Sequence, residues 1–555
     1  MSTRAPRSRL VNGLLRPLLP AAADYRGLGR SWRVDLLSGL TVGIVALPLA
    51  LAFGISSGAG AEAGLITAIV AGVVAAVFGG SNVQVSGPTG AMVVVLAPIV
   101  AVHGPGAVVT VSLLAGVMII IAGVLRLGRV VELIPWPVIE GFTLGIAIII
   151  FLQQVPSTLS SAGHDSNAVI AAGQALATAR WPDAGWSLGA IPVVVAIMII
   201  APRLHPRVPG SIIAIIVVTV AAVLLDLPLP RIGDLPAGLP APALPPLEPG
   251  LVISLLGPAA AVAGLAAIES LLSARVASAM ADTGPIDPDR ELVGQGLASL
   301  AAGLFGGMPA TGAIARTAVN VRSGARTRVA SITHALVLLL IVLAGAAAVS
   351  RIPVAALAGV LMVTATRMIS RATVRLVLRA SRSAALTFLI TAVITVTFDL
   401  IIAVVIGLAV ATFFALRMLA RSSGVHREPI PDQPRPGDEE IALFRIDGAL
   451  FFGAAQRLVD RVLTVDGVTV VVLRLSQLQL LDVTGARILV DLVHTLERRG
   501  ITVSIKGIRR EHLQVLTRVG VIDSLRHENH LFDELAPAIA HARDHVRRSR
   551  TSSTT

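Results

Sequence analysis

Long apolar stretches alternate with short polar connections over the first three quarters of the chain. A membrane span needs about 20 predominantly apolar residues, and twelve stretches approach or exceed that length. Two more segments, Val83–Val102 and Ala310–Val321, are interrupted by Gly and Pro. Together they predict fourteen spans as seven plus seven: 35–54, 62–79, 83–102, 106–125, 142–155, 188–201, 210–225, 251–280, 292–305, 310–321, 327–349, 354–369, 384–398 and 400–419.

Arginine is concentrated at alternate connections between these spans. The N-terminal segment carries Arg26, Arg30 and Arg33, and the even-numbered connections carry many more arginines than the odd ones. Because cytoplasmic loops near spans are rich in Lys and Arg, the pattern predicts a multi-pass protein of the cell membrane, here the inner membrane, with both termini in the cytoplasm. A nucleic-acid-binding protein would gather arginine on one soluble face, so no nucleic-acid partner is expected.

The composition supports a lipid environment and excludes several kinds of chemistry. Charged residues make up 14% of the chain and mean hydropathy is +0.82, whereas a soluble protein carries roughly a quarter charged residues. The absence of cysteine excludes disulfides and thiolate metal sites. No G-x-x-x-x-G-K-[ST] phosphate loop is present. The sequence predicts neither an enzyme nor a cofactor, and no metal site.

The composition changes after Arg421. Glu428–Glu440 is Pro-rich and charged, as linkers are, and beyond it strand and helix periodicities alternate as in a small α/β domain. The predicted strands are 441–446, 468–475 and 501–505, and the predicted helices 485–498 and 511–519. Residues 531–545 are expected to close the domain. We therefore expect a cytoplasmic segment at 1–34, a transmembrane domain at 35–421, a linker at 422–438, a cytoplasmic α/β domain at 439–546 and a disordered tail at 547–555.

The two halves of the membrane domain share a weak repeat. Phe78-Gly79-Gly80 and Phe305-Gly306-Gly307 each precede one of the interrupted segments, 227 residues apart. Seven spans per repeat require the second copy to be inverted, and paired interrupted spans in inverted repeats indicate a transporter binding site near the midplane. A helix that begins there leaves amide N–H groups unpaired and presents the positive end of its dipole, which favours an anion. The offset places Arg316 opposite Thr89.

Two charged residues lie inside predicted spans, where ionisable side chains are rare and costly. Arg316 is a candidate partner of a bound anion, and Glu269 is a candidate coupling acid, with Ser273 one turn later on the same helix face. The alternative is that Glu269 and Arg316 neutralise each other as a structural pair.

Several motifs resemble the SulP sulfate-permease family of anion transporters. The similarity runs from about Asp35 to about His541 through DLLSGLTVGIVALPLALAFG, VQVSGPTGA and the run from ELVGQGLASL to AIARTAVNVRSGART, and it includes a C-terminal STAS domain. The resemblance implies fourteen segments in two inverted seven-segment repeats, a core domain that moves against a gate domain, and a homodimer.

The same resemblance implies particular site residues. Motif by motif, the anion would lie beside Phe53, Thr89, Ala315 and Arg316, and the coupling ion beside Glu269 and Ser273. The chain departs from the family pattern at Leu49, where many members carry Gln, and at Ala315, where some carry Ser. Fewer polar groups around the anion leave the choice among anions open.

The implied function is secondary active transport of a small anion by alternating access, sulfate first and with proton coupling. Bicarbonate and C4-dicarboxylates are alternative substrates, and sodium is an alternative coupling ion. A membrane-tethered STAS regulatory protein is the alternative from another class, although an anchor needs neither interrupted spans nor intramembrane charges. The related nucleobase transporters are disfavoured by Arg316 and by the STAS domain.

The LDVTGA motif resembles the DSSG signature of STAS domains. The serine that is phosphorylated in the anti-sigma-factor antagonists corresponds to Thr484, a possible regulatory phosphosite. The alternative is that Asp482 or Thr484 serves only as a helix N-cap. Gly485 is expected to permit close backbone approach at this turn.

Overall fold

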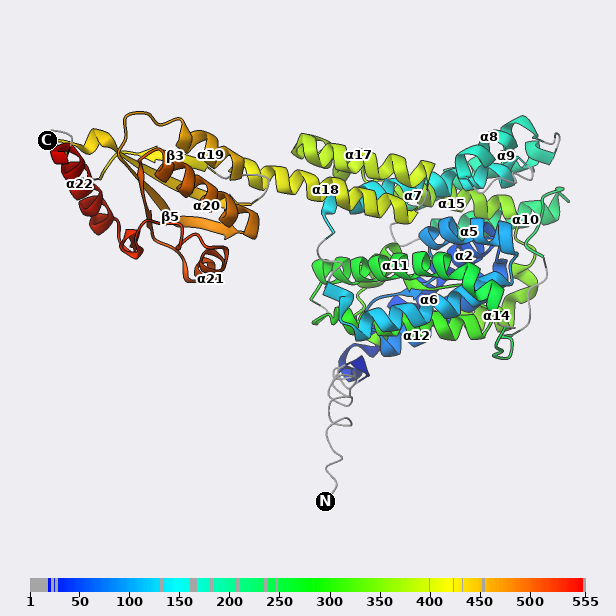
Figure 1. Cartoon of the computed structure of the whole chain (residues 1–555). Coiled ribbons are helices and arrows are strands. Elements are labelled where there is room, and N and C mark those ends of the chain that lie inside the picture. Colours follow the sequence, from blue (N-terminus) through cyan, green and yellow to red (C-terminus); the bar gives the residue numbers. More distant parts are fainter. Residues whose placement is uncertain are drawn as a thin grey trace, which may run out of the picture. The chain divides into compact units, whose positions relative to one another are not determined.

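The structure is a computed structural model of the whole chain (Figure 1). It describes residues 18–20, 24, 28–129, 134–159, 167–179, 181, 183–204, 209–233, 238–245, 248–282, 284–398, 400–422, 424–431, 433–451 and 455–552. Most of the expected N-terminal segment therefore lies outside the described residues. The chain forms two compact units, Met1–Leu408 and Ala409–Thr555, and each is considered by itself.

The first unit is helical, and a helix occupies each of the fourteen predicted spans. The helices are α2 (Leu28–Ser56), α3 (Ala61–Ile66), η3 (Thr67–Ala71), α4 (Gly72–Phe78), α5 (Gly90–His103), α6 (Ala107–Val124), α7 (Trp136–Thr158), α8 (Ala168–Ala177), α9 (Asp183–Leu204), α10 (Gly210–Leu224), α11 (Pro249–Met280), α12 (Pro288–Leu304), α13 (Ile314–Arg322), α14 (Arg328–Val349), α15 (Val354–Met368), α16 (Arg371–Ala380), α17 (Arg382–Thr397) and α18 (Leu400–Ser422), which continues into the second unit. The short helices α8 and α16 were not predicted.

Among the described residues, eight helices are long and apolar enough to cross a membrane. Four more, including α5 and α10, are apolar but shorter. Large apolar side chains such as Leu340 on α14 and Val405 on α18 are exposed, as expected where lipid rather than water covers the surface. The first unit is that of a multi-pass membrane protein.

The helices of the first unit pack as two groups (Figure 1). We call α2–α6 with α11–α14 the core group, and α7, α9, α10, α15 and α17 the gate group. Small residues allow close packing inside the core group: a Cβ on Gly296 of α12 would lie 2.6 Å from the Gly116 carbonyl oxygen of α6. Membrane helices pack closely through such small residues because lipid provides no hydrophobic drive between them.

Both interrupted segments are extended before they become helical. Strand β1 (Ser86–Gly87) pairs antiparallel with β2 (Thr311–Gly312). The Ala313 amide also donates to the Val85 carbonyl at 2.8 Å. Helix α5 then begins at Gly90 and helix α13 at Ile314. Two segments far apart in sequence are thereby held together where their helices start.

The predicted alignment of the two halves needs a correction. The strands begin at Ser86 and Thr311 and the helices at Gly90 and Ile314, offsets of 225 and 224 residues rather than 227. The connection from Gly-Gly to the strand is two residues shorter in the second half, and the connection from the strand to the helix is one residue shorter. Thr89 therefore corresponds to the N-cap residue Ala313, and Arg316 lies one turn further into α13.

The second unit is an α/β domain with a five-stranded sheet in the order β3-β4-β5-β6-β7. Strand β3 is antiparallel to β4, and the remaining neighbours are parallel. The strands are β3 (Gly424–Glu428), β4 (Ile441–Leu450), β5 (Val470–Leu481), β6 (Thr502–Lys506) and β7 (Leu531–Phe532); the helices are η5 (Asp438–Glu440), α19 (Ala455–Leu463), α20 (Val483–Arg498), α21 (Arg510–Val519), η6 (Glu528–His530) and α22 (Leu535–Ser552).

Three features of this unit differ from expectation. Strand β3 lies within the expected linker, 422–438, and α19 was not predicted. Helix α22 continues to Ser552, so residues 547–552 are helical rather than disordered. Its amphipathic pattern buries Ala538, Ala542 and Val546 against the sheet and leaves Arg547, Arg548 and Arg550 exposed, which explains why a charge-rich end of the chain is helical.

Helices cover both faces of this sheet. Alternate residues of β4 point to opposite sides: Phe444 belongs to the same buried cluster as Leu489 of α20, and Leu443 to the same buried cluster as Ile539 of α22. At the turn into α20, a Cβ on Gly485 would lie 2.2 Å from the Leu450 carbonyl oxygen. This confirms the predicted need for glycine there.

Candidate functional site

The first backbone N–H groups of α5 and α13 have no acceptor within their own helices. Their N-cap residues, Thr89 and Ala313, are extended and make no side-chain capping hydrogen bond. The first intrahelical bonds with these caps are Val93 N–H to Thr89 O and Thr317 N–H to Ala313 O, so the preceding amides of each helix have no intrahelical acceptor. Each helix therefore presents a partial positive charge beside the β1–β2 pair.

Arg316 adds a full positive charge at this place. It lies on the first turn of α13, and its side chain is 2% exposed. Its Nη2 donates to the carbonyl oxygen of Pro88, just before α5. Its Nη1 has no hydrogen-bond partner in the described part of the chain. A buried guanidinium with an unused donor is suited to an anion, because leaving such a group unpaired is costly.

Glu269 of α11 lies in the same region but does not pair directly with Arg316. Its Oε2 accepts a hydrogen bond of 2.8 Å from the Thr89 hydroxyl. The two charges interact electrostatically, yet they form no ion pair within 4.0 Å in the described chain. The geometry therefore disfavours the alternative that these residues are simply a structural pair.

The other predicted residues have different surroundings. Ser273 is buried and donates to the Thr317 hydroxyl at 3.0 Å, which in turn accepts the Val85 amide. Ser273 thus braces the start of α13, and no described hydrogen bond joins it to Glu269. Ala315 is exposed at the start of α13, so this helix end is open to solvent or ligand.

Phe53 of α2 is 6% exposed and packs beside α5. Its Cε1 lies 3.4 Å from the position of a Cβ on Gly90, the first residue of α5. Ile150 of the gate helix α7 approaches the same position to 2.1 Å. A residue larger than glycine at this helix start would therefore require the Ile150 side chain to change its position.

Four residues near the site were not predicted. The hydroxyls of Ser270 and Thr311 lie 3.0 Å apart beside Glu269. Gln84 is 5% exposed, and neither atom of its side-chain amide has a partner in the described chain. Ser270 follows Glu269 directly, and Gln84 lies within VQVSGPTGA, so both polar residues could have been found from the sequence. Ile150 could not, because it is one of several isoleucines in an apolar run.

A cavity of about 620 Å³ lies between the two helix groups. Its lining comes from α5, α7, α11, α17 and the start of α8, with Val94, Ile149 and Ala261 among the lining residues. Val94 lies on α5 after Thr89, Ile149 lies on α7 directly before Ile150, and Ala261 lies on α11 about two turns before Glu269. The proposed anion-binding residues are not part of this lining.

In the second unit, the N-cap of α20 is Asp482. Its Oδ1 accepts the Gly485 amide at 2.6 Å. Thr484 is exposed in the first turn of α20 and is not needed as the cap. A phosphate there would meet a helix N-terminus, which favours negative charge, so Thr484 stays a predicted phosphosite.

The first unit is a multi-pass helical unit in which two half-helices begin side by side and one of them carries a buried arginine. These features, together with the α/β unit that follows, are those of a membrane carrier of anions. The family model described as "Sulfate permease family" matches residues 32–391, and the model described as "STAS domain" matches residues 434–538. The chain belongs to the sulfate permease family, with a C-terminal STAS domain, and is an anion transporter rather than an enzyme.

Individual relatives agree with this assignment. The chain is 33% identical to the "Putative sulfate transporter YvdB" of Bacillus subtilis, over 91% of this chain and 96% of that protein. It resembles the solved "transmembrane domain of a cyanobacterium bicarbonate transporter BicA" with 34% identity and a TM-score of 0.63, covering 68% of this chain and 98% of that one. The murine Slc26a9 anion transporter shares the fold, with 17% identity, a TM-score of 0.80, and coverage of 98% and 96%.

Proposed function

We propose that this protein is a secondary active transporter of a small oxyanion, sulfate first, coupled to protons and working by alternating access. The observation that carries the proposal is the unused Nη1 donor of buried Arg316 beside two uncapped helix starts. Sulfate offers several acceptor oxygens to such donors. The names of relatives divide between sulfate and bicarbonate, so bicarbonate is the first alternative and a C4-dicarboxylate the second.

In this proposal the anion is held by Arg316 and by the first amides of α5 and α13, with Phe53, Thr89 and Ala315 beside it. The half-helix dipoles and the guanidinium act together because they converge on one place. Irregular backbone of this kind is tolerated within a membrane only where it is buried or lines a wet cavity.

Glu269 is the proposed coupling acid. An ionised carboxylate that accepts the Thr89 hydroxyl would repel an incoming anion. A proton on Glu269 removes that repulsion, so anion and proton bind together better than either alone, which is thermodynamic coupling. A sodium ion beside Glu269 would have the same electrostatic effect. The Ser273 hydroxyl could help to bind that ion only if it gave up its hydrogen bond to Thr317.

The proposal also includes the finer topology. The chain has fourteen membrane segments in two inverted repeats, both termini lie on the cytoplasmic side of the inner membrane, and the protein is a homodimer. The arginine pattern and the two interrupted segments support this arrangement.

Because the chain lacks cysteine, single introduced cysteines can show on which side of the membrane each connection lies. Arg351→Cys is expected to react with an impermeant thiol reagent from outside, and Arg382→Cys only from inside; the reverse pattern contradicts the topology.

The test of transport uses purified protein in proteoliposomes, with labelled sulfate, bicarbonate and fumarate supplied with and without a pH or sodium gradient. We expect sulfate to accumulate against its gradient when the outside is acidic. Arg316→Ala should reduce uptake by roughly 10–100-fold, because hydrogen bonds to charged groups are worth about 1.5–3 kcal/mol. Arg316→Lys keeps the charge but not the planar fork, and should retain part of the activity.

The matched control is Arg351→Ala, which removes an exposed arginine just after α14 and should leave uptake unchanged. Unchanged uptake in folded Arg316→Ala would remove Arg316 from the binding site. If no anion moves under any gradient, the tethered regulatory protein becomes the better hypothesis. Accumulation of bicarbonate or fumarate in place of sulfate would change the substrate and leave the site in place.

A further inference from the structure

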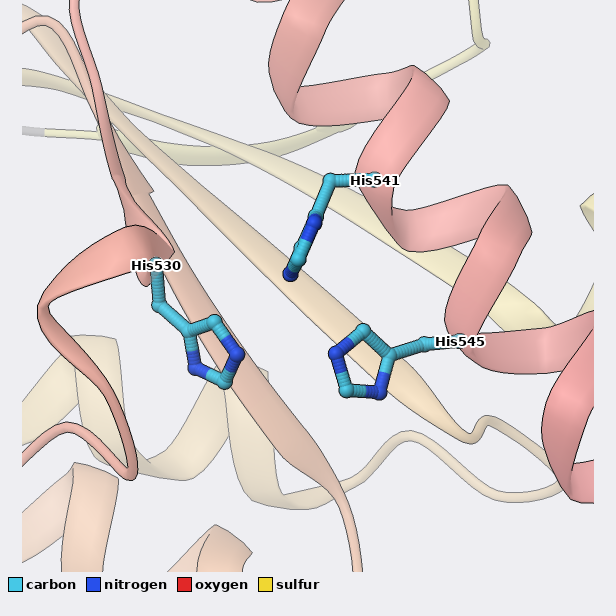
Figure 2. A group of neighbouring side chains, drawn as sticks. All are labelled: His530, His541 and His545. Carbon is cyan, nitrogen blue, oxygen red and sulfur yellow. The ribbon is translucent and has the colours of Figure 1, made fainter.

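Three histidines of the second unit converge on one small space (Figure 2). His541 and His545 are four residues apart on α22, so they lie on the same helix face. His530 ends η6, directly before strand β7, and its ring faces the other two (Figure 2). One ring nitrogen from each residue lies within 4.8 Å of the other two.

The three rings are close but poorly partnered. Ring centroids are separated by 5.2 Å for His530–His541, 5.3 Å for His530–His545 and 4.8 Å for His541–His545. His530 is 1% exposed and the other two are half-buried. The Nδ1 of His530 and the Nε2 of His541 have no hydrogen-bond partner in the described chain. Buried ring nitrogens without partners are costly, unless something else occupies the space between them.

The rings are in the right protonation state to bind a cation. Burial, with help from the neighbouring rings of His541 and His545, lowers the pKa of His530 to about 4. Burial also lowers the pKa of His541 and of His545. Neutral imidazole has a free lone pair and is a common metal ligand. The facing charges are mixed: Arg526 and Arg548 oppose a cation, and Asp544 favours one.

We propose that His530, His541 and His545 form a binding site for a divalent transition-metal ion such as Zn²⁺. Zinc takes imidazole nitrogens at about 2.0–2.1 Å in tetrahedral geometry, which requires nitrogens about 3.3 Å apart. Side-chain rotations can bring nitrogens from within 4.8 Å to that separation. Three nitrogen ligands leave a fourth position for water or another donor, and imidazole ligation favours zinc, copper or nickel over magnesium or calcium.

Metal binding at this place would fasten the C-terminal helix to the sheet. Helix α22 covers one face of the sheet through Ala538, Ile539 and Ala542, whereas His530 belongs to the segment that leads into edge strand β7. An ion shared by the two would link them directly and would stabilise the folded form over the unfolded one by mass action. This inference does not depend on which anion the first unit carries.

The test uses the full-length protein in detergent, purified with an affinity tag free of histidine, treated with EDTA and dialysed. Zn²⁺ is titrated in competition with a chromophoric chelator, and Co²⁺ is added separately as a spectroscopic probe. We expect one Zn²⁺ per chain and the intense visible absorption of tetrahedral Co²⁺. His541→Ala and His545→Ala should each weaken Zn²⁺ binding at least about 100-fold, since second-shell changes alone cost roughly 10–100-fold.

The matched control is His494→Ala, which removes an exposed histidine from α20 of the same unit and should leave binding intact. Hydrogen exchange of β4 and β5 in metal-free protein checks that each variant is folded. Exchange in α22 should slow on adding Zn²⁺ to the wild type and to His494→Ala, but not to the His541→Ala, His545→Ala double variant. The proposal is overturned if the wild type binds no Zn²⁺ below about 100 µM, or if the His541→Ala, His545→Ala double variant binds as tightly.

Discussion

Arg316 and Glu269 interact electrostatically but form no direct ion pair within the described chain. The guanidinium donates to the Pro88 carbonyl and keeps Nη1 unused, while the carboxylate receives the Thr89 hydroxyl. A direct ion pair would satisfy both groups and leave little reason to bind an anion. Holding opposite charges apart on α13 and α11 keeps each available to a ligand, and it makes the protonation of one matter to the binding of the other.

At this scale we predict that Glu269→Gln separates exchange from accumulation. The amide keeps the shape and a partner for Thr89 but cannot gain or lose a proton, so counterflow of the anion should continue while proton- or sodium-driven accumulation fails. The measurement compares the two modes in the same proteoliposomes. Glu248→Gln, at the exposed N-cap of the same helix, is the control. Accumulation that persists in Glu269→Gln assigns coupling to another group.

The sequence alone indicated some site residues well and others poorly. Intramembrane charges are rare, so Glu269 and Arg316 stood out. Ser273 was chosen for its helical spacing from Glu269, but spacing says nothing about competing partners, and its hydroxyl bonds to Thr317. Ile150 lies beside Gly90 through a contact between segments far apart in sequence, which periodicity does not encode.

Among the elements, the two half-helices depend on each other. The β1–β2 pair is two residues long, too short to be stable alone, and it persists because the helices around it are packed at close range. The interruption of both spans was predictable from Gly and Pro. The relative register of the two halves was not predictable, because two connections are shorter in the second half and together shift the alignment by three residues at the helix starts.

The α6–α12 contact gives a prediction about packing. Gly296→Ala places a methyl group 2.6 Å from the Gly116 carbonyl oxygen and 2.8 Å from the Ile120 amide nitrogen. Backbone atoms cannot rotate away, so the helices must separate, at a cost of about 1–3 kcal/mol. The thermal unfolding midpoint of the detergent-solubilised protein should fall by several degrees.

Gly264→Ala on α11 is the matched control, since nothing lies within 4 Å of the added Cβ. It should leave the midpoint unchanged or raise it slightly, because alanine favours a helix more than glycine does. Equal midpoints for the two variants would mean that the α6–α12 contact is not tightly packed.

The whole molecule combines two units stabilised by different forces. The first has few charges and packs apolar and small side chains, and the second carries arginine–carboxylate pairs at its surface and a β-sheet core. The change of composition after Arg421 predicted a second unit, which in the structure begins earlier, at Ala409 within α18. The sequence did not predict that the chain's charged end is helical, because the apolar face of α22 is visible only beside the sheet that it covers.

The second unit should therefore respond to acid through its ion pairs. Arg543 of α22 donates from Nε and Nη2 to the two carboxylate oxygens of Asp438, at 2.8 and 2.9 Å. These bonds lower the pKa of Asp438 from the ordinary aspartate value of about 3.9. The pair contributes fully at pH values above that ordinary value, and its contribution is lost as the pH falls through the lowered one.

Asp438→Asn is expected to destabilise α22 by about 1 kcal/mol at pH 7, the upper range for a partly exposed pair. Hydrogen exchange in α22 of the full-length protein should then be about fivefold faster than in the wild type. The difference should shrink as the pH is lowered below about 3.9, where the wild-type carboxylate is also neutralised. Asp491→Asn removes a longer, exposed pair with Arg487 on α20 and should change nothing. A pH-independent difference for Asp438→Asn would mean that the carboxylate stabilises the helix through packing rather than charge.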